Sequence, residues 1–310
     1  MRKNIKNINI GELYILFGLI GLCIVLTVFS PVFLTFGNLR NVILQMSINA
    51  TVAIGMTFVI LTGGIDLSVG SVVALSGVVM ASTLKAGVPI IVAILVAISV
   101  GGSCGLVNGF LVTKGRMPAF IATLGMMSIA RGLALSYSGG RSITGFSKNF
   151  AFLGNGTILK IPAPVLIMAG VFIFAYIILR YTRFGRYTYA IGGNKEATRL
   201  SGINVDKMLI FVYILCGVTA GIAAVMLSSR LSTSQPIAGQ GYELDAIAAT
   251  VIGGCSLSGG EGKIHGTFIG ALIISVLRNG LNLLNVSSYA QQTAIGLVII
   301  LAVFIDRLKK

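Results

Sequence analysis

Long runs of apolar residues alternate along the chain with short polar or basic segments. A helix needs about 20 apolar residues to cross a bilayer, and shorter helices are tolerated where protein buries them. The pattern therefore predicts an all-α, polytopic membrane protein with about ten transmembrane helices, forming a single domain over residues 1–310. The expected spans are residues 12–30, 41–62, 70–84, 89–112, 118–138, 162–180, 208–228, 244–258, 266–284 and 290–306.

The composition supports a membrane protein, because only 10% of the 310 residues are charged whereas a soluble domain has about 25%. So few charges could not cover the surface of a soluble fold of this length. The net charge of +15 comes from small groups of Lys and Arg between the apolar runs. A nucleic-acid-binding protein would instead carry a basic face with interleaved aromatic residues, so this class is disfavoured.

The distribution of Lys and Arg predicts the orientation of the chain. If the N-terminus is cytoplasmic, the inner segments hold 15 basic residues and the outer segments hold 6. This asymmetry is the one that the positive-inside rule describes, so we expect both termini in the cytoplasm. The two other basic residues, Arg131 and Arg278, fall within expected spans.

The longest inner segment, residues 180–207, contains a candidate surface helix. Asn194 can cap this helix, Glu196 lies in its first turn where the helix dipole favours an acid, and Gly202 suits its end. A short polar helix between two spans would lie on the membrane surface, where it could contact another protein. The alternative is a solvated loop that carries positive-inside charges.

Two glycine-rich breaks interrupt apolar helices in the two halves of the chain, at residues 60–75 and 251–266. Paired interruptions of this kind point to a translocation pathway in transporters, because broken backbone at membrane depth requires surrounding protein or a water-filled cavity. The alternative is a pair of ordinary glycine-rich turns. The candidate pathway residues in the breaks are Gly63, Gly64, Asp66, Ser68, Gly253 and Gly254.

Three acidic residues, Asp66, Glu243 and Asp245, lie in or beside these apolar segments. An acid within a membrane span is a functional candidate by default, so Glu243 and Asp245 are also candidate pathway residues. Capping of the following helices is the favoured role for all three. None has an obvious basic partner in mid-span, which argues against a proton- or sodium-coupled transporter.

Small residues four positions apart predict close contacts between helices. Asn108 lies beside one of these ridges, where it could face a polar pathway or form a hydrogen bond across helices, and it completes the candidate pathway set. The ridges are Gly101-xxx-Gly105-xxx-Gly109, Gly217-xxx-Gly221 and Gly266-xxx-Gly270.

The sequence offers no residues for catalysis or metal binding. His265 is the single histidine and lacks the partners of a metal site. The segment GEGK at 260–263 fails as a phosphate-binding loop, because Leu257 and Ile264 occupy positions that require Gly and Ser or Thr. We therefore expect no ATP hydrolysis by this chain and no enzyme activity.

Three segments, at residues 61–81, 183–207 and 230–273, carry a family resemblance. They read LTGGIDLSVGSVVALSGVVMA, RFGRYTYAIGGNKEATRLSGINVDK and RLSTSQPIAGQGYELDAIAATVIGGCSLSGGEGKIHGTFIGALI. The chain resembles the permease subunits of bacterial ABC-type sugar importers, and within that family it is most similar to those that carry ribose. Relatives that carry other sugars or the furanose-like autoinducer-2 share most of these motifs.

The resemblance implies a subunit that imports a monosaccharide across the bacterial inner membrane by alternating access. It implies a second permease subunit, expected to be an identical copy, a cytoplasmic ATPase that binds ATP and Mg²⁺, and an extracytoplasmic sugar-binding protein. The chain itself would contact membrane lipid and hold no cofactor. A self-contained secondary transporter and a membrane-bound enzyme are the competing classes.

In this family a coupling helix with the pattern E-A-A-x-x-x-G seats in a groove of the ATPase. Glu196, Ala197, Thr198 and Gly202 match that pattern, with Thr in place of the second Ala. The resemblance thus gives the candidate surface helix that Asn194 caps a specific role in ATPase coupling.

Overall fold

The computed structural model describes residues 10–308, and helices make up most of them. Arg2, Lys3, Lys6, Lys309 and Lys310, which contribute to the predicted orientation, lie outside the described residues. In chain order the elements are α1 (Ile10–Phe29), α2 (Phe36–Leu61), α3 (Val69–Lys85), α4 (Ile90–Thr113), α5 (Ala119–Ser138), β1 (Ile143–Thr144), α6 (Lys148–Asn155), β2 (Thr157–Ile158), β3 (Ile161–Pro162), α7 (Ala163–Tyr181), α8 (Arg183–Gly193), α9 (Lys195–Leu200), α10 (Val205–Leu231), β4 (Thr233–Ser234), α11 (Tyr242–Ile252), α12 (Ile264–Leu283) and α13 (Ser288–Leu308).

Nine of the ten expected spans correspond to single helices, and the all-α membrane fold is confirmed. Within the described residues, six helices are long and apolar enough to cross a membrane, namely α2, α4, α5, α7, α10 and α12. The helices α1, α3 and α13 contribute shorter apolar stretches.

The expected span at residues 244–258 is wrong as a crossing helix. Helix α11 has 11 residues, so it is about 16 Å long, roughly half of the ~30 Å hydrocarbon core. It ends at Ile252, with Gly253 as its C-cap, and the next residue, Gly254, has a φ of +87° that most side chains disfavour. The residues before α11 are also irregular, since Gly239 and Gly241 have φ values of +69° and +85°.

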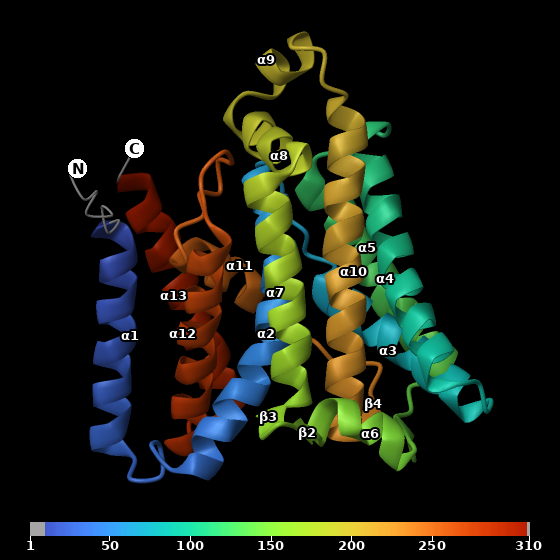
Figure 1. The fold of residues 1–310 in the computed structure, drawn as a ribbon, viewed down its shortest axis with the longest axis vertical. Coiled ribbons are helices and arrows are strands. Elements are labelled where there is room, and N and C mark those ends of the chain that lie inside the picture. The colour runs from blue at the N-terminus through green and yellow to red at the C-terminus, as the bar shows by residue number, and fades with distance from the viewer. Residues whose placement is uncertain (1–9, 309–310) are drawn as a thin grey trace.

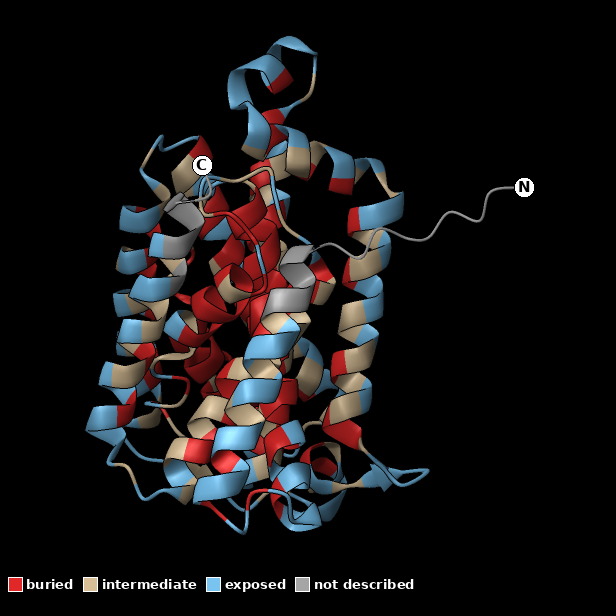
Figure 2. Cartoon of the chain, turned by 90° about the vertical axis from the view of Figure 1, so that its left-hand side faces the viewer, coloured by how far each residue is buried: buried red, intermediate tan, exposed pale blue. Residues whose placement is uncertain are grey.

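Most residues of helices α2 and α10 are buried. Buried residues gather in the interior of the helix bundle (Figure 2). Helix α4 packs directly against α10, because a Cβ on Gly101 or Gly105 would overlap the backbone of Gly217 or Tyr213. Helix α12 packs in the same way on α11, with Gly266 against Gly253. The predicted small-residue contacts are therefore confirmed, and they bring these helices together at backbone distance.

The two ends of the helix bundle differ in their connections (Figure 1). Helices α8 and α9 stand at the end drawn at the top, which we call the α9 end. The opposite end carries α6 and the β2–β3 hairpin, in which Ile158 pairs with Ile161. Near that end β1 pairs antiparallel with β4, with Ile143 opposite Ser234.

Candidate functional site

The candidate coupling helix forms as predicted and projects from the bundle at the α9 end (Figure 1). The side chain of Asn194 accepts a hydrogen bond of 2.9 Å from the backbone N–H of Ala197. Glu196 lies in the first turn and forms an ion pair of 2.8 Å with Arg199. Gly202 follows the helix with a φ of +81°, the left-handed conformation that favours glycine.

The outer surface of α9 combines charge with an exposed apolar side chain. Leu200 is 87% exposed, whereas Thr198 is buried and its hydroxyl bonds to the carbonyl oxygen of Asn194 at 2.8 Å. Thr198 thus faces inward, so the Thr in place of the second Ala does not alter the exposed surface of α9.

Helix α8 leads into α9 and contacts both glycine-rich breaks. A Cβ on Gly192 would overlap the carbonyl oxygen of Leu61 and the amide nitrogen of Gly260. One turn earlier, the hydroxyl of Tyr189 donates a hydrogen bond of 2.9 Å to the carbonyl oxygen of Gly262. Burial raises the pKa of Tyr189, so this hydroxyl remains a donor at neutral pH.

The two breaks lie against each other, although the sequence only predicts that they resemble each other. The amide of Gly260 donates a hydrogen bond of 2.9 Å to the carbonyl oxygen of Leu61. A Cβ on Gly63 would stand 3.4 Å from the carbonyl oxygen of Ser258, and Gly63 has a φ of +77°. The structure thus brings Gly63 and Gly64 to the same end of the bundle as the loop that follows Gly253 and Gly254.

A buried polar cluster fixes the first break. Asp66 is 1% exposed, and its carboxylate accepts hydrogen bonds from the Ser68 backbone N–H at 2.9 Å and from the Ser68 hydroxyl at 2.6 Å. The side-chain amide of Asn108, on α4, donates to the Ser68 hydroxyl at 2.9 Å. Asp66 therefore binds Ser68, the residue that precedes α3, and accepts no hydrogen bond from an N–H group within that helix, whereas Asn108 bonds across helices.

The other two acids have different partners. The carboxylate of Glu243 accepts a hydrogen bond of 3.3 Å from the Gly241 backbone N–H at the start of α11, which fits capping. Asp245 is buried and forms an ion pair with Arg278 of α12, with 2.7 Å between Oδ2 and Nε. The expectation that Asp245 caps a helix and has no basic partner in mid-span is therefore wrong.

The second basic residue within a span, Arg131 of α5, supports the irregular segment before α11. Its Nη1 donates hydrogen bonds of 2.7 and 2.8 Å to the carbonyl oxygens of Pro236 and Ala238. Arg131 lies twelve residues into α5, about 18 Å from the start of that helix. These carbonyl groups would otherwise lack partners at membrane depth, which is costly.

Sequence reasoning did not assign roles to Gly192, Arg131 and Arg278. A basic residue within a membrane span is a functional candidate by default. The position of the two arginines within predicted spans is therefore enough to mark them as functional candidates. Their partners were not predictable, because Asp245 and Pro236 belong to distant segments. Gly192 stands within a Gly-Gly pair, Gly192-Gly193, that gives no hint which glycine makes the contact.

Comparison with known proteins identifies the family. The family described as "Branched-chain amino acid transport system / permease component" matches residues 38–305. The chain belongs to this permease family. The permease is 52% identical over 299 residues to the ribose import permease protein RbsC of Escherichia coli strain K12, covering 95% of this chain and 93% of the relative. It is 49% identical to RbsC of Bacillus subtilis strain 168, covering 94% and 91%.

A solved structure also resembles the permease in fold. The chain from PsaBC of Streptococcus pneumoniae, solved in complex with Fab, matches with a TM-score of 0.50 and 14% identity, covering 89% of this chain and 93% of that one. This similarity concerns the fold alone. Family membership and the apolar helices together make the chain a multi-pass membrane transport protein.

Proposed function

We propose that the chain imports ribose as the transmembrane subunit of an ATP-driven ABC importer. The observation that carries this proposal is the identity of about half of the residues, over nearly the whole length, to relatives named as ribose import permeases. A neutral sugar requires hydroxyl, amide and backbone groups along its path rather than fixed charges, and a separate extracytoplasmic sugar-binding protein would supply the selectivity.

Helix α9 is the proposed docking element for a cytoplasmic ATPase, which would bind ATP and Mg²⁺. The exposed Leu200 supports this role, because a large apolar side chain on a projecting polar helix suits burial in a partner. This assignment implies that the α9 end, toward which α1 begins and α13 ends (Figure 1), faces the cytoplasm, in agreement with the distribution of Lys and Arg. Asn194, Glu196, Ala197, Thr198 and Gly202 then shape the docked helix.

Movement of α9 would reach the breaks through α8. Because Gly192 packs against Leu61 and Gly260 at once, a displacement of α8 must shift or separate the two breaks. Alternating access requires an element with two arrangements that the partner biases, and the joined breaks are our candidate. The translocating unit would contain a second, identical permease subunit.

The candidate pathway residues divide by their contacts. Gly63, Gly64 and Gly254 are the proposed flexible positions beside the sugar path, and Gly253 would hold α11 against Gly266. Asp66, Ser68 and Asn108 bond to one another and would hold the start of α3 in position. Glu243 and Asp245 would hold α11, through Gly241 and Arg278.

Reconstitution tests this function. The permease, its ATPase and its binding protein are assembled in vesicles, and we expect ribose with the binding protein to stimulate both ATP hydrolysis and uptake. Stimulation by another sugar but not by ribose would contradict the substrate. Uptake by the permease alone, driven by an ion gradient, would contradict the ABC mechanism in favour of a secondary transporter.

A pair of variants tests the docking role of α9. Leu200→Asp should abolish binding of the ATPase to the permease without reducing the amount of folded permease. Leu159→Asp is the matched control, because Leu159 is 91% exposed but lies in the turn of the β2–β3 hairpin at the opposite end. Equal effects of the two substitutions would contradict docking through α9.

A further inference from the structure

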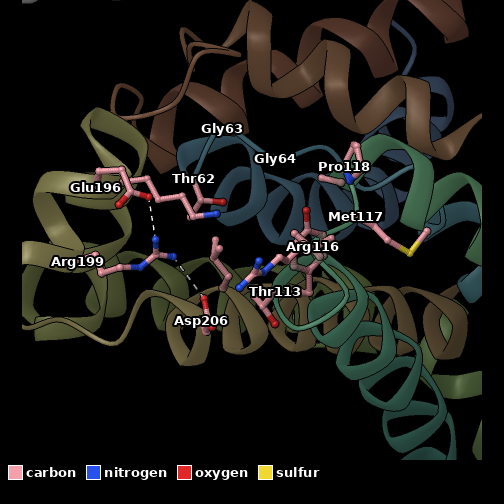
Figure 3. Close-up of a pocket in the computed structure, with 15 residues that line it drawn as sticks. Thr62, Gly63, Gly64, Thr113, Arg116, Met117, Pro118, Glu196, Arg199 and Asp206 are labelled. Atoms are coloured by element: carbon pink, nitrogen blue, oxygen red, sulfur yellow. Dashed lines mark hydrogen bonds and ion pairs between the residues drawn. The ribbon is translucent and has the colours of Figure 1, made fainter.

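A cavity of about 730 Å³ opens behind α9 (Figure 3). Its walls come from α9, the start of α10, the first break and the connection between α4 and α5. Ligand-binding pockets have volumes of about 300–1,000 Å³, so the space suits a small molecule. Among its lining residues, Gly63 and Gly64 lie beside the proposed transport path and Glu196 belongs to the docking helix α9.

The rim of this cavity carries an excess of positive charge. The acids at the rim are already neutralised, since Arg199 pairs with Glu196 at 2.8 Å and with Asp206 at 3.8 Å, and Lys114 pairs with Asp206 at 3.2 Å. Arg116 and Lys195 also line the cavity, and neither forms an ion pair with a described residue. Two cations are therefore available to a ligand.

The floor of the cavity presents a buried hydroxyl group. Tyr213 lines the cavity and is 1% exposed, and its hydroxyl has no hydrogen-bond partner among the described residues. A buried polar group without a partner costs about 1–3 kcal/mol, so such groups call for an explanation. Gly64, which also lines the cavity, lies directly beside this hydroxyl, because a Cβ there would stand 2.7 Å from the Tyr213 oxygen.

The rim and the floor define the chemistry of an occupant. Asp206 at the rim and Tyr213 at the floor both line the cavity and lie seven residues apart on α10. At the helical rise per residue, this spacing puts the floor about 10 Å from the rim. A ligand that satisfies both needs an anionic group for Arg116 and Lys195, and a hydroxyl-rich part that reaches Tyr213. A neutral sugar would leave the two cations unused.

We propose that this cavity binds a small anionic polyol of the monosaccharide phosphate class. The phosphate lies between Arg116 and Lys195, and a sugar hydroxyl bonds to the hydroxyl of Tyr213. The bound ligand connects α9, α10 and the first break, so it stabilises the arrangement in which these walls enclose it. Gly63 and Gly64 line this cavity and also lie beside the proposed sugar path, but the binding does not depend on which sugar the importer carries.

Calorimetric titration tests the proposal on the full-length permease in phosphatidylcholine nanodiscs, which contain no anionic headgroup that would compete. The probe is D-ribose 5-phosphate, with D-ribose and inorganic phosphate as separate arms. We expect Arg116→Gln to weaken binding of the probe about tenfold and Tyr213→Phe about threefold, as the loss of a charged and a neutral hydrogen bond predicts. Arg186→Gln, on the exposed surface of α8, is the matched control and should bind like the wild type.

Each arm can overturn the proposal. Failure of the wild type to bind the sugar phosphate, or unchanged binding by Arg116→Gln, would do so. Equal affinity for ribose would remove the anionic requirement, and equal affinity for inorganic phosphate would remove the polyol requirement. Tyr213→Phe deletes only an unpartnered hydroxyl, so its folding should be preserved. Uptake assays on the same wild-type protein report separately on the proposed transport function.

Discussion

The backbone amide of Gly260 lies 2.9 Å from the carbonyl oxygen of Leu61 and donates a hydrogen bond to it. This bond joins the end of α2 to the loop between α11 and α12, so the two glycine-rich breaks form one unit. Gly192 of α8 packs against both atoms. Any motion of α8 relative to α2 must therefore open or rearrange this three-segment contact.

The Gly192 contact predicts the effect of a single added methyl group. Gly192→Ala would place a Cβ against the Leu61 oxygen and the Gly260 nitrogen, and overpacking of this kind costs about 1–3 kcal/mol. We expect sugar uptake in reconstituted vesicles to fall roughly tenfold, since about 1.4 kcal/mol corresponds to a factor of ten in rate.

Gly193→Ala is the matched control for this prediction. A Cβ on Gly193 would meet nothing within 4 Å, so uptake should remain close to that of the wild type. If both substitutions reduce uptake equally, the loss reflects flexibility of the Gly-Gly pair and not the contact with the breaks.

The ion pair of Asp245 and Arg278 predicts an asymmetry between its two deletions. Asp245 is 1% exposed and Arg278 is 30% exposed. Arg278→Leu leaves a buried, unpaired carboxylate, and removal of one partner of a buried pair costs roughly 3–5 kcal/mol. Asp245→Leu leaves a cation that still reaches the surface, so it should lower the midpoint of thermal unfolding less.

The double variant completes this test. Replacing both residues by Leu removes both charges, and such replacements are often neutral or stabilising. The unfolding midpoint of the purified double variant should return toward that of the wild type. A double variant less stable than either single variant would show that the two side chains act independently.

The sequence predicts best those features that depend on local spacing. The spacing of Gly101, Gly105 and Gly109 predicts a tight helix contact, and the structure contains it because small residues four apart always form one ridge. The capped helix after Asn194 is predictable for the same reason, since a cap and its helix are neighbours in sequence.

Contacts between segments that are far apart in the chain cannot be predicted from the sequence. The length of the apolar run predicts a span at residues 244–258 that continues past Gly253. A run of apolar residues does not reveal where a helix ends at membrane depth. The sequence favours a capping role for Asp245, because the ion pair with Arg278 depends on how α11 packs against α12 and cannot be predicted from spacing. Likewise, the resemblance of the two breaks does not show that Leu61 meets Gly260.

The backbone conformation at Gly202 predicts how α9 tolerates substitution. Its φ of +81° costs about 1–2 kcal/mol for most residues, whereas Asn adopts it more readily. A Cβ there would meet nothing within 4 Å, so only the backbone conformation, and not contact with neighbouring residues, limits substitution at this position. Gly202→Val should reduce ATPase stimulation strongly and Gly202→Asn only slightly. Similar losses would indicate that the partner contacts the position directly.

The hydrogen bond between Asn108 and Ser68 predicts energetic coupling between α4 and the first break. Asn108 donates to the Ser68 hydroxyl at 2.9 Å, and Ser68 in turn donates to the buried Asp66 carboxylate. We expect Asn108→Ala and Ser68→Ala each to lower the free energy of unfolding by about 1–3 kcal/mol. Groups in one hydrogen-bond network couple by about 0.5–3 kcal/mol, so the double variant should lose less than the sum of the single losses. Chemical denaturation of the four proteins in detergent measures this cycle, and strict additivity would mean that the amide of Asn108 does not stabilise the break.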